Sequence, residues 1–192
     1  MKYNRKQIIC HFCKGNHYSR NCNIEKKKSI HVKKRVGKFM EKYYADNFKC
    51  IRCGSNNLHV KNDRSPSLDI TCPTCPNKLE IKSKCLSVHN LPKDINLPHG
   101  SFQHYINRQA EGLDIAIIIY KANRKTKEIT IREIMYFKNN DINTNIINII
   151  PQKKSRLSKI IINNREDPRI LKVRLPDRTI INFKSQIENI VV

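Results

Sequence analysis

Apolar and polar residues alternate with the period of a β-strand in two segments of the chain, Leu68–Thr71 and Leu79–Lys84. Residues two apart in a strand lie on the same face, so each segment has one apolar and one polar face. The segments are separated by a short Cys- and Pro-containing turn, which favours an antiparallel pair. If the two strands pair, Asp69, Glu80 and Lys82 meet at one exposed spot while the apolar faces point toward a core.

Other segments carry the patterns of helices and of further strands. Apolar residues recur at helical spacing over Val36–Phe48, and Ser101–Glu111 predicts a second helix that Gly112 ends. The segment Leu113–Tyr120 is almost entirely apolar, which is typical of a central strand covered on both faces. Strands are also expected at Leu58–Val60 and Glu128–Phe137. The predicted order is therefore helix, three strands, helix and buried strand, an α/β arrangement.

Asp69, followed after ten residues by Glu80-Ile81-Lys82, resembles the active site of the PD-(D/E)XK nucleases, which have the restriction-endonuclease-like fold. One departure is that Ser67-Leu68, rather than a proline, precedes the aspartate. The resemblance implies that Asp69, Glu80 and the backbone carbonyl of Ile81 hold Mg²⁺ or Mn²⁺. It also implies that Lys82 orients or deprotonates the attacking water. Hard cations such as Mg²⁺ take oxygen ligands and acidify their bound water, in agreement with these roles.

The two predicted helices add candidates to this catalytic set. In the nucleases that the sequence resembles, a glutamate of the helix before the sheet sometimes joins the metal site, and Glu41 is the residue so positioned. An ordinary exposed glutamate is an equally good interpretation of Glu41. Polar residues of the helix after the Glu-x-Lys strand approach the cleaved phosphate in such enzymes. Gln109 is the favoured candidate among Gln103, His104, Arg108 and Gln109.

Four cysteines have the spacing C-x2-C-x18-C-x2-C, namely Cys50, Cys53, Cys72 and Cys75. This spacing is typical of a zinc ribbon, because four thiolates on two tight turns close a tetrahedral Zn²⁺ site. The second pair lies in the turn between the Asp69 strand and the Glu80 strand. We therefore expect a structural zinc ion that fixes the separation of two carboxylates, which otherwise repel each other.

Residues 10–22 contain a second group of metal ligands, Cys10, Cys13, His17 and Cys22. The group resembles a retroviral-type CCHC zinc knuckle, although it is one residue shorter than the usual spacing. So short a segment has no means of holding a fold other than a bound Zn²⁺. The resemblance implies that Phe12 and Tyr18 stack on unpaired bases and that Lys14 and Arg20 meet phosphates.

The charge of the chain indicates a polyanionic partner. The 192 residues include 38 Lys and Arg against 16 Asp and Glu, a formal net charge of +22. Such a charge favours nucleic acid, with DNA expected before RNA. No apolar run approaches the length of a membrane span, and the start of the chain lacks the apolar region of a secretory signal. Seven of the eight cysteines fall into ligand-like groups, which indicates a reducing compartment, nucleus or cytoplasm, rather than disulfides.

Together these patterns predict three parts: a zinc knuckle and the start of a basic linker (1–28), a nuclease-like core with a zinc ribbon (29–140), and a basic C-terminal extension with a hairpin (141–192). The expected function is metal-dependent hydrolysis of DNA phosphodiester bonds, with branched or single-stranded regions preferred because of the knuckle. The alternative is a noncatalytic, transcription-factor-like protein that binds nucleic acid through ribbon and knuckle. The oligomeric state stays open, although many enzymes of this resemblance dimerise to cut two strands.

Overall fold

The structure, a computed structural model, describes residues 36–61, 68–86, 91–123, 126, 128–152, 156–173 and 175, and the backbone of residues 180–182. The chain divides into two units, Met1–Phe39 and Met40–Val192. Of the first unit only residues 36–39 are described, and they begin a helix that spans residues 36–47. The predicted zinc knuckle and its base and phosphate contacts lie outside the described residues and stay predictions.

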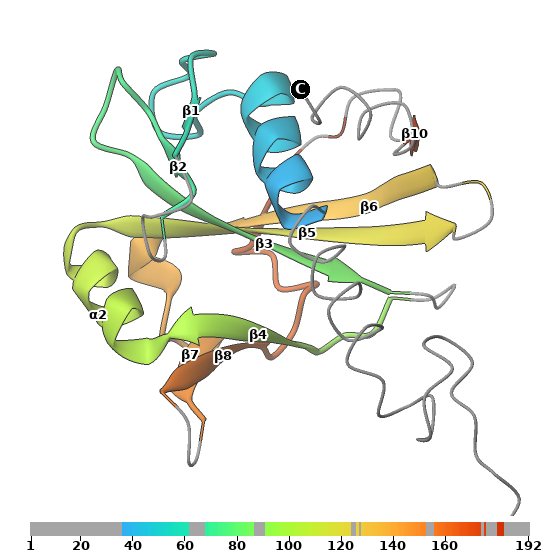
Figure 1. Ribbon diagram of the computed structural model, residues 1–192. Helices are drawn as coiled ribbons and strands as arrows, with labels where there is room; N and C mark the ends of the chain where they lie inside the picture. The colour runs from blue at the N-terminus through green and yellow to red at the C-terminus, as the bar shows by residue number, and fades with distance from the viewer. Residues whose placement is uncertain are drawn as a thin grey trace, which may run out of the picture. The chain divides into compact units, whose positions relative to one another are not determined.

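A seven-stranded mixed sheet dominates the second unit (Figure 1). Its strands are β1 (His59–Val60), β2 (Ile70–Thr71), β3 (Lys78–Cys85), β5 (Leu113–Asn123), β6 (Glu128–Phe137), β9 (Leu171–Lys172) and β10 (Ile180–Asn182). The order is β1-β2-β3-β5-β6-β10, and β9 also pairs with β6. β3 and β5 run parallel, whereas the other strand pairs described in this sheet are antiparallel. The three-stranded meander predicted around the acidic residues is thus confirmed.

The central strand β5 is covered on both faces, as its apolar run predicted. All seven residues of Leu113–Ile119 are buried. On one face Tyr44, from the helix 36–47, lines a small pocket together with Leu79 of β3 and Tyr136 of β6, the two strands that flank β5. On the other face Ile115 and Ile117 belong to the main hydrophobic core. Burial on both faces explains why the strand shows no apolar–polar alternation.

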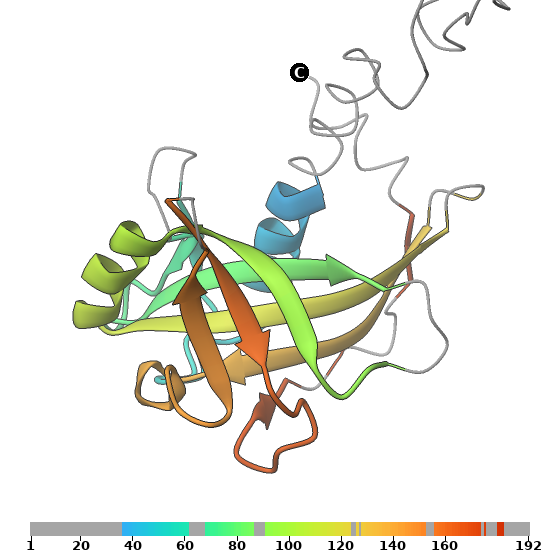
Figure 2. The same ribbon diagram turned by 90° about the horizontal axis from the view of Figure 1, so that it is seen from below.

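A second, three-stranded sheet lies across the face of the large sheet opposite the helix 36–47 (Figure 2). Its strand order is β4 (Ile95–Ser101), β8 (Leu157–Ile162) and β7 (Ile147–Pro151). The helix α2 (Phe102–Ala110) follows β4, and a short 3₁₀ helix, η2 (Asn139–Asp141), follows β6. None of the helices in the described part of the chain is long and apolar enough to cross a membrane.

Two strands of this second sheet lie in segments whose sequence shows no clear strand pattern. β4 contains Pro98, and β7 follows the Asn-rich residues 139–145. β4 is an edge strand of its sheet, where proline is tolerated because one side of the strand makes no ladder bonds. Pro98 stands in β4 opposite Lys159, with its side chain exposed.

The C-terminal residues also differ from the expected hairpin. β9 and β10 both pair with β6 rather than with each other. Lys172 stands opposite Met135, and Ile180 stands opposite Thr130, so the two short strands follow one another along the same neighbour. The region 141–192 therefore supplies strands to both sheets.

Candidate active site

β2 and β3 bring Asp69 and Glu80 together. The antiparallel register pairs Ile70 with Leu79, and continuing it by one residue sets Asp69 opposite Glu80. Directly opposed residues of an antiparallel pair share a face. Asp69 Oδ2 accepts a hydrogen bond of 2.7 Å from the backbone N–H of Ile81, which fixes its carboxylate beside β3. The two acids that the sequence pattern singled out are therefore neighbours on one face of the sheet.

Glu80 is buried, in contrast to the exposed spot expected from strand alternation. Only 2% of the residue is exposed, because β4 of the second sheet covers this part of β3. Its Oε1 forms an ion pair with the ammonium group of Lys82, whose side chain is 23% exposed and reaches the surface. Its Oε2 is one of the buried polar atoms that have no hydrogen-bond partner among the described residues. A buried carboxylate oxygen without a donor fits a site for a cation, because leaving it unpaired is costly.

The surroundings of this pair shift both pKa values upward. Burial raises the pKa of Glu80 to about 7, the nearby Lys82 ammonium opposes that shift, and the negative charge of Asp69 adds to it. Burial lowers the pKa of Lys82, but the carboxylates of Glu80 and Asp69 more than offset this, so its pKa is raised. Lys82 thus stays charged at neutral pH, while the Glu80 carboxyl binds a proton or a cation readily.

The two helical candidates have different surroundings. The charge of Glu41, on the helix 36–47, contributes to the raised pKa of Lys82, so this glutamate acts on the acidic site electrostatically. Gln109 is half-buried on α2 and accepts a hydrogen bond of 3.4 Å from Asn143, in the loop before β7. The hydrogen bond described for Gln109 therefore links α2 to that loop rather than to Asp69 or Glu80, and its catalytic role stays a prediction.

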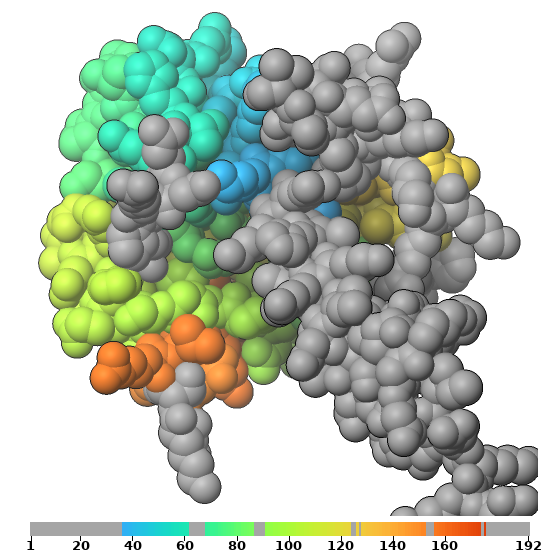
Figure 3. All heavy atoms as spheres, viewed as in Figure 1, coloured from blue at the N-terminus to red at the C-terminus, as the bar shows by residue number. Residues whose placement is uncertain are grey.

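α2 itself lies at the surface, where its yellow-green atoms are seen in Figure 3. Of its nine residues only Tyr105 is buried. Ser101 occupies the N-cap position, as expected, but its side chain makes no capping hydrogen bond. Gly112 ends the helix region with a φ of 81°, a left-handed conformation that favours glycine.

His99 is the site residue that the sequence interpretation missed. It lies on β4 and is only 4% exposed, and its Nδ1 is 3.9 Å from Oε1 of Glu80. Burial and then the charge of Lys82 lower the pKa of His99 to about 3, so its ring is neutral. The signal was present in the sequence as the alternation Ile95, Leu97, His99, whose members are all buried. Pro98, between Leu97 and His99, and the following Gly100 concealed it.

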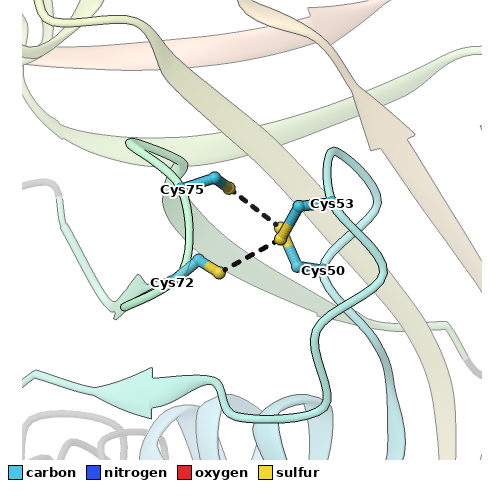
Figure 4. Close-up of side chains that lie close together, drawn as sticks. All are labelled: Cys50, Cys53, Cys72 and Cys75. Carbon is cyan, nitrogen blue, oxygen red and sulfur yellow. Dashed lines mark hydrogen bonds between the residues drawn. The ribbon is translucent and has the colours of Figure 1, made fainter.

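The four ribbon cysteines converge from two loops (Figure 4). Their sulfur atoms all lie within 4.8 Å of one another, with 3.6 Å between Cys50 and Cys75 and 3.5 Å between Cys53 and Cys72. Four sulfurs at about 2.3 Å from one Zn²⁺ in a tetrahedron are about 3.8 Å apart, so the cluster fits a zinc ion. Burial raises the pKa of the Cys72 thiol, but backbone N–H groups of Thr74 and Cys75 outweigh it and bring that pKa to about 6. The thiolate form that binds metal is thus favoured at one ligand.

The cysteine cluster is tied to the large sheet by a buried carboxylate. Arg52, between Cys50 and Cys53, donates hydrogen bonds of 2.8 and 2.5 Å to the two carboxylate oxygens of Asp114 in β5. Asp114 is fully buried and also accepts hydrogen bonds from the Tyr136 hydroxyl and, at 2.8 Å, from the backbone N–H of Asn139. The first cysteine turn is therefore anchored to the strand that runs parallel to β3.

An acidic pair and a lysine thus lie on two adjoining strands, β2 and β3, of a mixed sheet. The family model described as DpnI: Dam-replacing family matches residues 16–189, and the chain belongs to this family. It is a restriction-endonuclease-like family of modification-dependent nucleases. A search among curated proteins finds no match.

Proposed function

We propose that the protein is a divalent-metal-dependent deoxyribonuclease of the PD-(D/E)XK type that hydrolyses phosphodiester bonds. The observation that carries the proposal is the neighbourhood of Asp69, Glu80 and Lys82 on one face of the sheet, in a member of a nuclease family. Two carboxylates at such short range repel each other unless a cation or a proton lies between them. The raised pKa of Glu80 is caused first by burial, and the negative charge of Asp69 adds to it.

Asp69, Glu80 and the carbonyl of Ile81 are the groups that would hold Mg²⁺ or Mn²⁺. When bound, the cation would lower the pKa of a water molecule and offset the charge that develops on the phosphate. Lys82 keeps its proton and reaches the surface, so it can orient the attacking water and the scissile phosphate through hydrogen bonds. The negative charge of Glu41 would help to keep Lys82 protonated. The expected product carries a 5′-phosphate.

The proposal includes zinc at Cys50, Cys53, Cys72 and Cys75 and at the predicted knuckle of Cys10, Cys13, His17 and Cys22. The knuckle side chains Phe12, Lys14, Tyr18 and Arg20 and the net charge of +22 would hold the DNA, with a preference for branched or single-stranded regions. Metal-bound thiolates require a reducing compartment. Two active sites can cut the two strands of a duplex in one binding event, so the proposal extends to a homodimer on DNA.

A cleavage assay with matched variants tests the proposal. The purified chain is incubated with unmethylated duplex, methylated duplex, branched and single-stranded DNA, with Mg²⁺, Mn²⁺ or EDTA. Asp69→Ala, Glu80→Ala and Lys82→Ala are each expected to lower the cleavage rate by about 100-fold or more while DNA binding is retained. Lys84→Ala is the control, because Lys84 lies on the same strand and face as Lys82 but hydrogen-bonds to the carbonyl of Asn96 at 3.1 Å.

If the wild-type protein cuts none of these substrates with any divalent metal, the nuclease proposal is refuted and the noncatalytic nucleic-acid-binding alternative stands. Cleavage that survives in all three alanine variants would instead refute the assignment of the site. The methylated and unmethylated duplexes separate a requirement for modified DNA from a preference for branched or unpaired strands.

A further inference from the structure

The imidazole of His99 is a fully buried polar side chain beside Glu80. Its side chain has no exposed surface, and neither ring nitrogen has a hydrogen-bond partner among the described residues. Its neighbours are Tyr105, whose ring packs edge-on with centroids 5.6 Å apart, and Glu80. A neutral imidazole carries one donor and one acceptor, and burying both without partners costs several kcal/mol. A buried histidine in that environment therefore fits a site for a ligand such as a metal ion.

We propose that His99 is a third side-chain ligand of the divalent cation held by Asp69 and Glu80, so that this site offers a nitrogen as well as oxygen donors. The inference rests on the nuclease function proposed above. Ligand atoms on one ion lie about 2.1 Å from it, so two of them are at most about 4.2 Å apart. The separation of 3.9 Å between Nδ1 and Glu80 Oε1 is within that limit. The partnerless Oε2 of Glu80 points to the same need for a cation.

The donor set decides which metals the site favours. Carboxylate and carbonyl oxygens suit Mg²⁺ and Mn²⁺, whereas imidazole favours later transition metals. A site with Asp69 and Glu80 alone would hold Co²⁺ only slightly more tightly than Mg²⁺. A site that includes His99 should show a clear preference for Co²⁺. Exchanging the imidazole for an amide, as in His99→Asn, offers oxygen in place of nitrogen and should reduce that preference.

The test is calorimetric titration of the full-length, zinc-saturated protein with Co²⁺ and with Mg²⁺. His99→Asn is expected to lower the affinity ratio of Co²⁺ over Mg²⁺ by about 10-fold or more. His59→Asn, a change of the same kind at an exposed histidine of β1, should leave the ratio unchanged. A second measurement needs no variant: in the wild-type protein with Co²⁺, the ring protons of a coordinated His99 shift far outside the diamagnetic NMR range.

The outcomes separate the two proposals. Suppose that Glu80→Gln abolishes cleavage and the binding of both metals, whereas His99→Asn lowers the affinities for Co²⁺ and Mg²⁺ equally and the ring protons of the wild-type protein do not shift. Then His99 is not a ligand, and the nuclease proposal stands. If Glu80→Gln binds both metals as tightly as wild type, the metal site itself is refuted, and with it the proposed catalytic function. A fall in the ratio together with shifted ring protons supports the assignment of His99.

Discussion

Replacing Asp114 with asparagine tests whether the buried carboxylate holds the cysteine turn to the sheet. In the native protein each carboxylate oxygen receives two donors: Oδ1 from Arg52 Nη2 and Asn139 N, and Oδ2 from Arg52 Nε and the Tyr136 hydroxyl. An asparagine has one oxygen and one NH₂ group. Whichever way its amide is turned, the NH₂ faces a pair of donors, and Arg52 loses its charged partner.

The magnitude follows from these contacts. Two hydrogen bonds to a charged group are lost, each contributing about 1.5–3 kcal/mol. Tyr136 can rotate its hydroxyl to accept from the new amide, which recovers part of the loss. Arg52 is 35% exposed, so water takes up some of its unpaired charge. Asp114→Asn should therefore lower the free energy of unfolding by about 3 kcal/mol, within the range of about 3–5 kcal/mol for breaking a buried pair.

Urea unfolding followed by circular dichroism measures this change, with zinc present in excess. The control is Asp167→Asn, because Asp167 also receives two hydrogen bonds from one guanidinium group, that of Arg169, at 2.8 and 2.7 Å, but does so at the surface. The backbone N–H of Arg169 donates a third, at 3.0 Å. Water screens this pair, so Asp167→Asn should destabilise the protein far less than Asp114→Asn. Equal destabilisation by the two asparagine variants would contradict the reasoning. So would an Asp114→Asn protein that releases zinc to a chelator no faster than wild type.

Three further predictions concern charge and metal. The pKa of Glu80 is raised from 4.5 to about 7, so its contribution to the stability of the metal-free protein is present below pH 4.5 and lost as the pH rises through 7. Mg²⁺ must displace the proton from Glu80, so the Mg²⁺ affinity should rise roughly tenfold per pH unit below pH 7 and level off above it. Calorimetry at pH 6, 7 and 8 would measure this. A Mg²⁺ affinity that is flat over this range would contradict the shift. Cys72→Ser should unfold the core and abolish activity, whereas Cys13→Ser should weaken DNA binding and leave the core folded; equal losses of melting temperature would contradict this division. DNA binding should weaken steeply with salt, as a straight line of log affinity against log salt concentration, and salt-insensitive binding would instead indicate a partner other than nucleic acid.

The elements around the acidic residues could be predicted because their patterns are local. The alternation of β2 and β3, the apolar run of β5 and the glycine after α2 each follow from the conformational preferences of neighbouring residues. The cysteine cluster was equally accessible, because the spacing of its ligands already implies two tight turns.

The second sheet was not predictable in the same way, because its strands pair across long separations in the chain. Ile95 stands opposite Ile162, and Ile147 also stands opposite Ile162, so β8 joins two segments that look like loops by themselves. The burial of Glu80 depends on this sheet, and no pattern within β3 indicates it. His99 escaped notice for the same reason: its partner in the site is 19 positions earlier on another sheet.

The dependence of β4 on β8 has a consequence for the order in which the protein matures. In the described part of the chain β8 is the only strand that pairs with β4, and Ser158 Oγ also donates a hydrogen bond of 2.9 Å to the carbonyl of Gly100. During synthesis Asp69, Glu80 and Lys82 leave the ribosome long before residues 157–162. Until then β4 lacks the strand that pairs with it, and the cover over Glu80 is incomplete. The growing chain thus contains Asp69 and Glu80 well before the second sheet can form, bury Glu80 and raise its pKa.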